Sequence, residues 1–85
     1  VMFQYLFSFE SLTAAQTARG VLDALYIPCR IVRAPREVAK RGCGYVLRVA
    51  GRDGARTADI LRGQQILFSN SFRVLQDGTA EEAKL

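Results

Sequence analysis

Hydrophobic and polar residues alternate near the start of the chain and then change to a helical period. Phe3, Tyr5, Phe7 and Phe9 stand at every second position, which in a strand places all four side chains on one face. From Ser11 onward the apolar positions recur every three or four residues, which predicts a helix with Ser11 as its N-cap. We therefore expect this helix to cover the aromatic face of a sheet.

A glycine interrupts the predicted helix. The apolar stripe around it consists of Leu12, Ala15, Leu22 and Leu25, widened by Ala18 and Val21. Gly20 is expected to cost about 1 kcal/mol relative to alanine. We expect this cost to be offset by close contact between the helix and the sheet.

The remaining pattern predicts three more strands and one more helix. They are a strand over residues 27–34, a loop over 35–43, a strand from Tyr45, a short helix ending at Gly63, and a strand containing Phe72 and Val74. The element order βαββαβ predicts an α+β, ferredoxin-like sandwich, with a four-stranded antiparallel sheet and two helices on one face.

The predicted sandwich occupies residues 1–76 as a single domain, and residues 77–85 form a polar C-terminal tail, frayed or loosely helical. One face of the four-stranded sheet is expected to stay uncovered. That face would be a mixed basic and aliphatic surface made of Leu6, Arg30, Val32, Val46 and Arg48. It could be solvated or could pair with a second copy of the chain.

Composition narrows the function. The chain has 85 residues, 49% of them hydrophobic, with two cysteines and no histidine. Lack of histidine excludes the usual Ser/His/Asp and Cys/His catalysis, and two cysteines alone cannot hold a structural zinc ion. We therefore expect no metal and no organic cofactor. A domain this small favours a carrier or binding module over a self-sufficient enzyme, and no apolar run is long enough to span a membrane.

Positive charge is concentrated in the middle of the chain. Residues 30–56 contain eight basic and two acidic residues, a net charge of +6 within a chain of net charge +4. Such a segment predicts an anionic ligand, an acidic partner or a phosphate backbone. The alternative interpretation is a solvated surface that keeps a small protein soluble.

Cys43 has the surroundings of a reactive thiol. It stands between Gly42 and Gly44 and directly follows Lys40 and Arg41. Glycines leave the sulfur sterically open, and nearby cations stabilise a thiolate and so lower the thiol pKa. The alternative interpretation is that the glycines only serve a turn and that Cys43 packs beneath it.

The other cysteine is expected to be structural. Cys29 is in phase with its apolar neighbours in the second strand, which predicts a buried thiol. In a hairpin closed by residues 35–43, Cys29 and Cys43 would lie on the order of 15–20 Å apart, beyond the roughly 7 Å that a disulfide allows between Cα atoms. We therefore predict two free thiols and a reducing, cytoplasmic location.

The residues around Cys43 also resemble a known family. The runs that carry the resemblance are Pro35-Arg36-Glu37-Val38 and Cys43-Gly44-Tyr45-Val46-Leu47-Arg48. They are similar to the signature of the putative selenium/sulfur carrier protein-like family of small bacterial proteins, over roughly residues 3 to 75. The resemblance implies that Cys43 carries sulfur or selenium, with Pro35, Arg36 and Gly44 matching the surrounding motif. Family members often have small hydroxyl residues at the positions of residues 39–42. In this chain those residues are Ala-Lys-Arg-Gly, which makes the loop more basic.

These observations predict a carrier that takes sulfur or selenium on Cys43 as a persulfide or selenopersulfide, received from a donor protein. Arg36, Lys40 and Arg41 would stabilise the anionic sulfur together with Gly42 and Gly44, and Pro35 would shape the loop. The alternative is a non-catalytic module that binds an anion, a nucleic acid or a protein through this loop or through the basic sheet face. A third hypothesis is a homodimer formed through that face. A single aromatic, Tyr45, on the third strand argues against RNA recognition.

Overall fold

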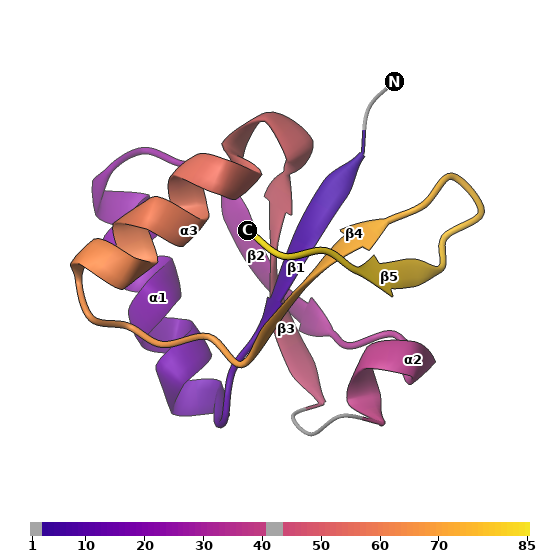
Figure 1. Cartoon of the computed structure of the whole chain (residues 1–85). Helices are drawn as coiled ribbons and strands as arrows, with labels where there is room; N and C mark the ends of the chain where they lie inside the picture. Colours follow the sequence, from indigo (N-terminus) through magenta and orange to yellow (C-terminus); the bar gives the residue numbers. More distant parts are fainter. Residues whose placement is uncertain (1–2, 41–43) are drawn as a thin grey trace.

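A five-stranded antiparallel sheet is the centre of the computed structural model of the chain, which describes residues 3–40 and 44–85. Helices α1 and α3 lie on one side of the sheet, and the short helix α2 lies on the other (Figure 1). The elements are β1 (Gln4–Ser8), α1 (Leu12–Ala24), β2 (Cys29–Arg33), α2 (Arg36–Ala39), β3 (Tyr45–Ala50), the 3-10 helix η1 (Gly51–Asp53), α3 (Gly54–Gly63), β4 (Asn70–Val74) and β5 (Ala80–Glu82). The predicted α+β class is confirmed.

The strands are ordered β2-β3-β1-β4-β5, and every neighbouring pair is antiparallel. The first strand of the chain is therefore the central one. Phe7 lies opposite Leu47 of β3 and opposite Ser71 of β4. Because side chains alternate along each strand, this register aligns the apolar positions of all three strands on shared faces.

The predicted aromatic face packs against α1 and α3 through Tyr5, Phe7 and Phe9, whereas Phe3 at its start is exposed. Phe7 and Phe9 are buried in this core, and Tyr5 packs against it. The buried members of the cluster are Phe7, Phe9, Ala15, Ala18, Leu22, Ile27, Leu47, Val49, Ala58 and Leu61. Burial of large apolar side chains contributes about 1.5–3 kcal/mol each, so this cluster is the main source of stability.

Helix α1 begins as the sequence predicts. The Ser11 Oγ accepts a hydrogen bond from the backbone N–H of Ala14 at 3.1 Å, which caps the helix. The expectation about Gly20 is wrong, because this residue lies on the exposed side of the helix and an added Cβ would have nothing within 4 Å. The ends of the predicted stripe, Leu12 and Leu25, are also exposed.

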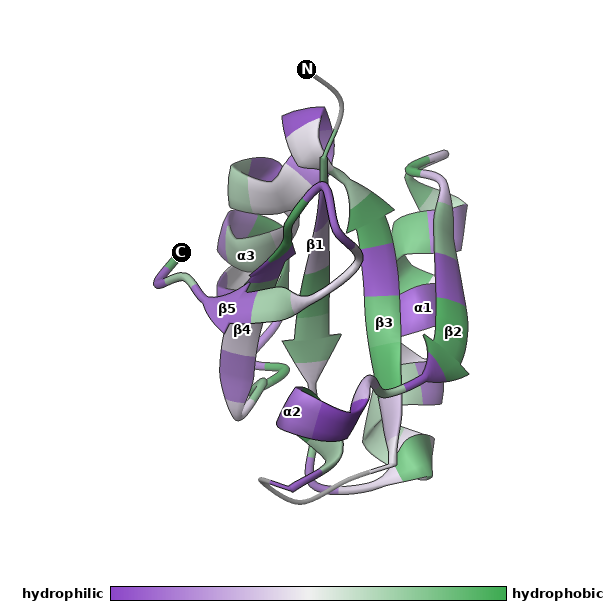
Figure 2. Cartoon of the chain, turned by 90° about the vertical axis from the view of Figure 1, so that its right-hand side faces the viewer, coloured by the Kyte–Doolittle hydropathy of each residue, from purple (hydrophilic) through white to green (hydrophobic). Residues whose placement is uncertain are grey.

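The opposite face of the sheet is covered in part by α2, which corrects the prediction that it stays open. Leu6 and Val46, expected on an open surface, are buried in a second cluster with Val38 and Phe72. Val38 belongs to α2, a four-residue helix inside the predicted loop. Figure 2 shows α2 lying in front of this face. Such a helix has too few residues for its period to be visible in the sequence.

The polar tail also differs from the expectation, since residues 80–82 form β5 and pair with β4. The sheet therefore has five strands and not four. A tight turn makes the pairing: Gly78 has φ +88°, and the Asp77 carboxylate accepts a hydrogen bond from the Thr79 N–H at 3.0 Å. The side chain of Arg73 pairs with Glu81 across the two strands. Three residues are too few for an alternating pattern to predict a strand.

Candidate functional site

The loop that carries Cys43 leaves the sheet through a closed stem. The backbone N–H of Ala34, which follows β2, donates a hydrogen bond of 2.8 Å to the carbonyl of Gly44, which precedes β3. Register places Arg33 opposite Tyr45, directly below that bond. The stem therefore continues the β2–β3 ladder by one step, so Gly44 stands at the edge of a regular hairpin.

Pro35 turns the chain from the stem into α2. Its carbonyl accepts hydrogen bonds from the N–H groups of Val38 and Ala39, at 3.0 and 2.8 Å. Proline at the start of a helix is favourable because its φ, here −58°, already suits the turn and its missing N–H is not needed there. Pro35 is thus the N-cap of α2, and its role in shaping the loop around Cys43 stays a prediction.

Helix α2 is held to the sheet by one apolar anchor and presents its charged residues to solvent. Val38 is buried, whereas Arg36, Glu37 and Lys40 are exposed. The Lys40 N–H donates to the Arg36 carbonyl at 3.2 Å, so the two basic residues stand one helical turn apart on the solvent side. The structure thus brings together Arg36 and Lys40, two of the predicted thiolate-stabilising cations.

Three of the predicted site residues lie outside the described part of the chain. These are Arg41, Gly42 and Cys43. The described neighbours on either side are Lys40, the C-cap of α2, and Gly44, which is exposed. The exposure and reactivity of the Cys43 thiol therefore stay predictions.

The hairpin adds a cation that sequence reasoning did not assign to this loop. Arg33 is exposed and lies opposite Tyr45, two positions after Cys43 in the chain. Arg33 is ten positions before Cys43 in the sequence, and only the β2–β3 register brings it opposite Tyr45. The signal that could have found it was the predicted hairpin itself, because the end of the strand over residues 27–34 must lie opposite the start of the strand from Tyr45.

Cys29 lies where the pattern predicted but is not fully buried. It is a free thiol at the start of β2, only partly covered by the helix-side core. Its Sγ lies 3.8 Å from the Asp23 Oδ1 on α1. Partial burial raises the pKa of the Cys29 thiol, the Asp23 carboxylate raises it further, and Arg19 partly opposes them. Because the thiolate is disfavoured, Cys29 is a poor nucleophile.

This environment predicts slow alkylation of Cys29. In a Cys43→Ser chain, the iodoacetamide reaction of Cys29 is expected to rise with pH only above the range in which free cysteine ionises. Because the folded pKa is raised, the thiol stabilises the fold fully below the unfolded pKa, and this contribution is lost as pH rises through the folded pKa. Asp23→Asn is expected to shift the rate profile to lower pH, and Asp59→Asn on exposed α3 is the control. A wild-type profile at or below that of free cysteine would contradict the assignment.

Other ligand types find little support in residues 3–40 and 44–85. No three Cys, Asp or Glu side chains there form a group able to hold a metal ion. None of the helices there has the length and apolar character needed to cross a membrane.

The fold and stem define an α+β protein in which the basic helix α2 follows the end of the β2–β3 ladder. The family model described as "Putative Se/S carrier protein-like" matches residues 4–73, and the chain belongs to this family. Among curated proteins and among solved structures, no match is found. The family assignment made from the residues around Cys43 is thus confirmed.

Proposed function

We propose that this chain is a carrier that accepts a sulfur or selenium atom on the thiol of Cys43. The carrying observation is the family match over residues 4–73, which includes Cys43 and whose description names this cargo. Of the two cysteines, Cys29 has a raised pKa and sits beside a carboxylate. Cys43 is therefore the better candidate for the acceptor.

The chemical step is a sulfur transfer without net oxidation. The Cys43 thiolate attacks the terminal sulfur of a persulfide on a donor protein. A new S–S bond forms at Cys43, the S–S bond of the donor breaks, and the donor cysteine leaves as a thiolate. Cys43 then holds a persulfide, and the same exchange with a selenopersulfide loads selenium. The nucleophile must be a thiolate, so a low pKa at Cys43 favours the step.

Charge around the loop supports this role. Arg36 and its neighbour Lys40 are exposed at α2, and Arg33 is exposed at the stem. In the sequence, Arg41 stands two positions before Cys43. Cations near a thiolate or persulfide anion stabilise it. They also favour a donor protein whose docking surface is acidic.

The finer fold class is part of the same proposal. The first four strands and the helices α1 and α3 make a ferredoxin-like sandwich, to which β5 adds an edge strand.

A thiol carrier of this kind works in a reducing compartment, which favours the cytoplasm. Dimerisation through the sheet face stays a prediction, and α2 leaves less apolar surface for it, because Leu6 and Val46 are buried beneath the helix.

Intact mass spectrometry tests the transfer. The wild-type chain is incubated with a cysteine desulfurase and L-cysteine, and is expected to gain one sulfur atom. Cys43→Ser is expected to gain none. Cys29→Ser is the matched control, because it removes the other thiol, and is expected to gain one sulfur as the wild type does. Loading of the Cys43→Ser chain, or no loading of the wild type by the desulfurase, would overturn the proposal.

A further inference from the structure

Two arginines face each other on the sheet, far from the Cys43 loop. Arg30 of β2 lies directly opposite Arg48 of β3 in the antiparallel register. The next residue in the same row is Leu6 of β1, which is buried. Arg48 is consequently only partly exposed, with an apolar neighbour on one side and a like charge on the other. Like charges directly opposite each other destabilise a sheet.

In the described part of the chain, no carboxylate forms an ion pair with either arginine. Asp23 lines the same surface hollow as the two arginines, but its carboxylate pairs with Arg19 at 3.6 Å and accepts from Cys29. Arg30 and Arg48 are therefore two uncompensated donors side by side, an arrangement that suits an external oxyanion.

The pair borders a hollow large enough for a small ligand. The hollow has a volume of about 300 Å³. Its lining residues are Gln4, Asp23, Pro28, Cys29, Arg30, Arg48, Val49 and Ala50. The size is at the lower end of the range for small-molecule sites. The Gln4 amide adds a neutral donor and acceptor beside the two cations.

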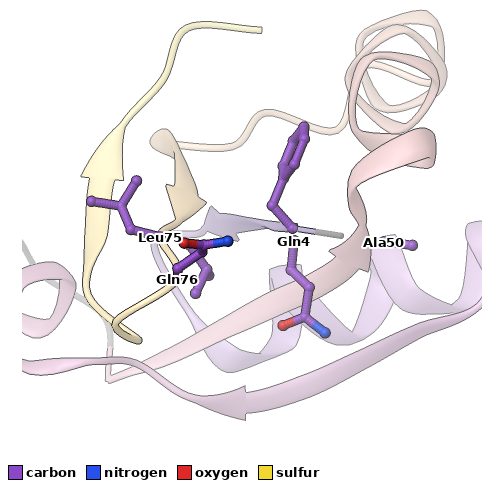
Figure 3. A pocket seen from close by; sticks show the side chains of 6 residues that line it. Gln4, Ala50, Leu75 and Gln76 are labelled. Carbon is purple, nitrogen blue, oxygen red and sulfur yellow. The ribbon is translucent and has the colours of Figure 1, made fainter. Parts of the chain in front are cut away.

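A second hollow adjoins the first and has no charged residue in its lining. It has a volume of about 310 Å³ and shares Gln4 and Ala50 with the arginine hollow. Figure 3 shows Leu75 and Gln76 on one side of Gln4 and Ala50 on the other. Phe3 and Val74 complete the lining. The two hollows together run from a cationic end to an apolar end across the part of the sheet that α2 does not cover.

We propose that this trough binds a small organic oxyanion, a carboxylate or a phosphate monoester joined to an aromatic or aliphatic body. The Arg30 and Arg48 guanidinium groups hold the anionic head, and Gln4 marks the boundary between the two hollows. Phe3, Val74 and Leu75 contact the apolar body. The site is independent of the proposed carrier function, because it uses neither Cys43 nor the basic loop.

Amide-resolved NMR titration of the full chain at low ionic strength tests the site. Benzoate and phenyl phosphate are the two probes, and the tighter of them identifies the head group. Either is expected to shift Gln4, Arg30, Arg48 and Ala50 and to reach saturation. Inorganic phosphate alone is expected to bind more weakly, and the neutral benzamide is expected not to saturate. Failure of both anions to saturate, or shifts centred on α2 instead, would overturn the proposal.

Matched variants distinguish a specific anion site from nonspecific attraction to the positive charge of the protein. Arg48→Gln and Arg30→Gln are each expected to raise the Kd by about tenfold or more. Arg56→Gln removes the same charge from the exposed surface of α3 and is expected to change the Kd less than twofold. Cys43→Ala is expected to bind as the wild type does, so failure here and failure of the carrier proposal are distinguishable. Equal losses in the Arg48 and Arg56 variants would refute a specific site.

Stability gives a second readout. Without ligand, Arg48→Gln is expected to raise the urea midpoint at low salt, because it relieves the repulsion from Arg30. Added phenyl phosphate is expected to raise the midpoint of the wild type and not of the variant. A lower midpoint for the unliganded variant would show that Arg48 serves the fold and not a ligand.

Discussion

Replacing Gly54 with alanine is expected to destabilise the fold by about 3 kcal/mol. Gly54 is buried at the start of α3, where an added Cβ would lie 2.2 Å from the Cδ2 of Tyr5 and 2.6 Å from its Cε2. The Tyr5 ring packs against the helix-side core and makes an edge contact with Phe3, so it cannot move aside freely. Either the ring leaves the core or α3 moves away from the sheet. Urea unfolding followed by circular dichroism measures the loss.

Gly20→Ala is the matched control for this change. It also places an alanine in a helix, but at an exposed position of α1 where the new Cβ meets nothing within 4 Å. It is expected to stabilise the protein by about 1 kcal/mol, because alanine has the higher helix propensity. The two substitutions should therefore move the unfolding midpoint in opposite directions. Similar midpoints for both variants would mean that α3 does not pack on Tyr5 as described.

Replacing Val38 with aspartate is expected to release α2 from the sheet at a cost of about 4 kcal/mol. Val38 is 1% exposed and lies in a cluster with Leu6, Val46 and Phe72. A carboxylate there would be buried in an apolar site without a partner. Hydrogen exchange measures the result, and the N–H groups of Val38, Ala39 and Lys40 are expected to lose protection, since their bonds exist only while α2 is formed.

Two further variants calibrate the Val38 prediction. Val38→Ala only removes apolar contacts and is expected to cost about 2 kcal/mol. Glu37→Ala changes the exposed neighbour and is expected to stay within about 0.5 kcal/mol of the wild type. Unchanged protection of the α2 amides in Val38→Asp would show that the helix does not depend on this anchor.

Because α2 and the stem hold the loop, Val38→Asp also bears on the carrier proposal. The helix ends at Ala39 with Lys40 as its C-cap, and the stem bond joins Ala34 to Gly44. If the basic side chains must stand near the acceptor thiol, loss of α2 is expected to slow the desulfurase-dependent gain of sulfur without removing Cys43. An unchanged loading rate would show that sulfur transfer to Cys43 does not depend on α2.

The sequence predicted the elements whose period repeats several times. The aromatic row of β1 and the Ser11 cap of α1 are confirmed, because each depends on local geometry that the residues themselves impose. The same analysis missed α2 and β5, which have four and three residues. Elements this short have no detectable period, and they form because the sheet offers Val38 an apolar face and β4 an unpaired edge.

The candidate site divides in the same way. Residue types and their order alone gave the reactive-cysteine hypothesis, from a cysteine between glycines after two basic residues, and the family, from the runs at residues 35–38 and 43–48. Only the tertiary structure decided that Arg33 stands at the stem and that Arg30 and Arg48 lie side by side. Strand register sets those distances, and register depends on which faces of the sheet are buried. The order of residues therefore determines the chemical groups around Cys43, and the packing of the strands determines which arginines from distant parts of the chain become neighbours.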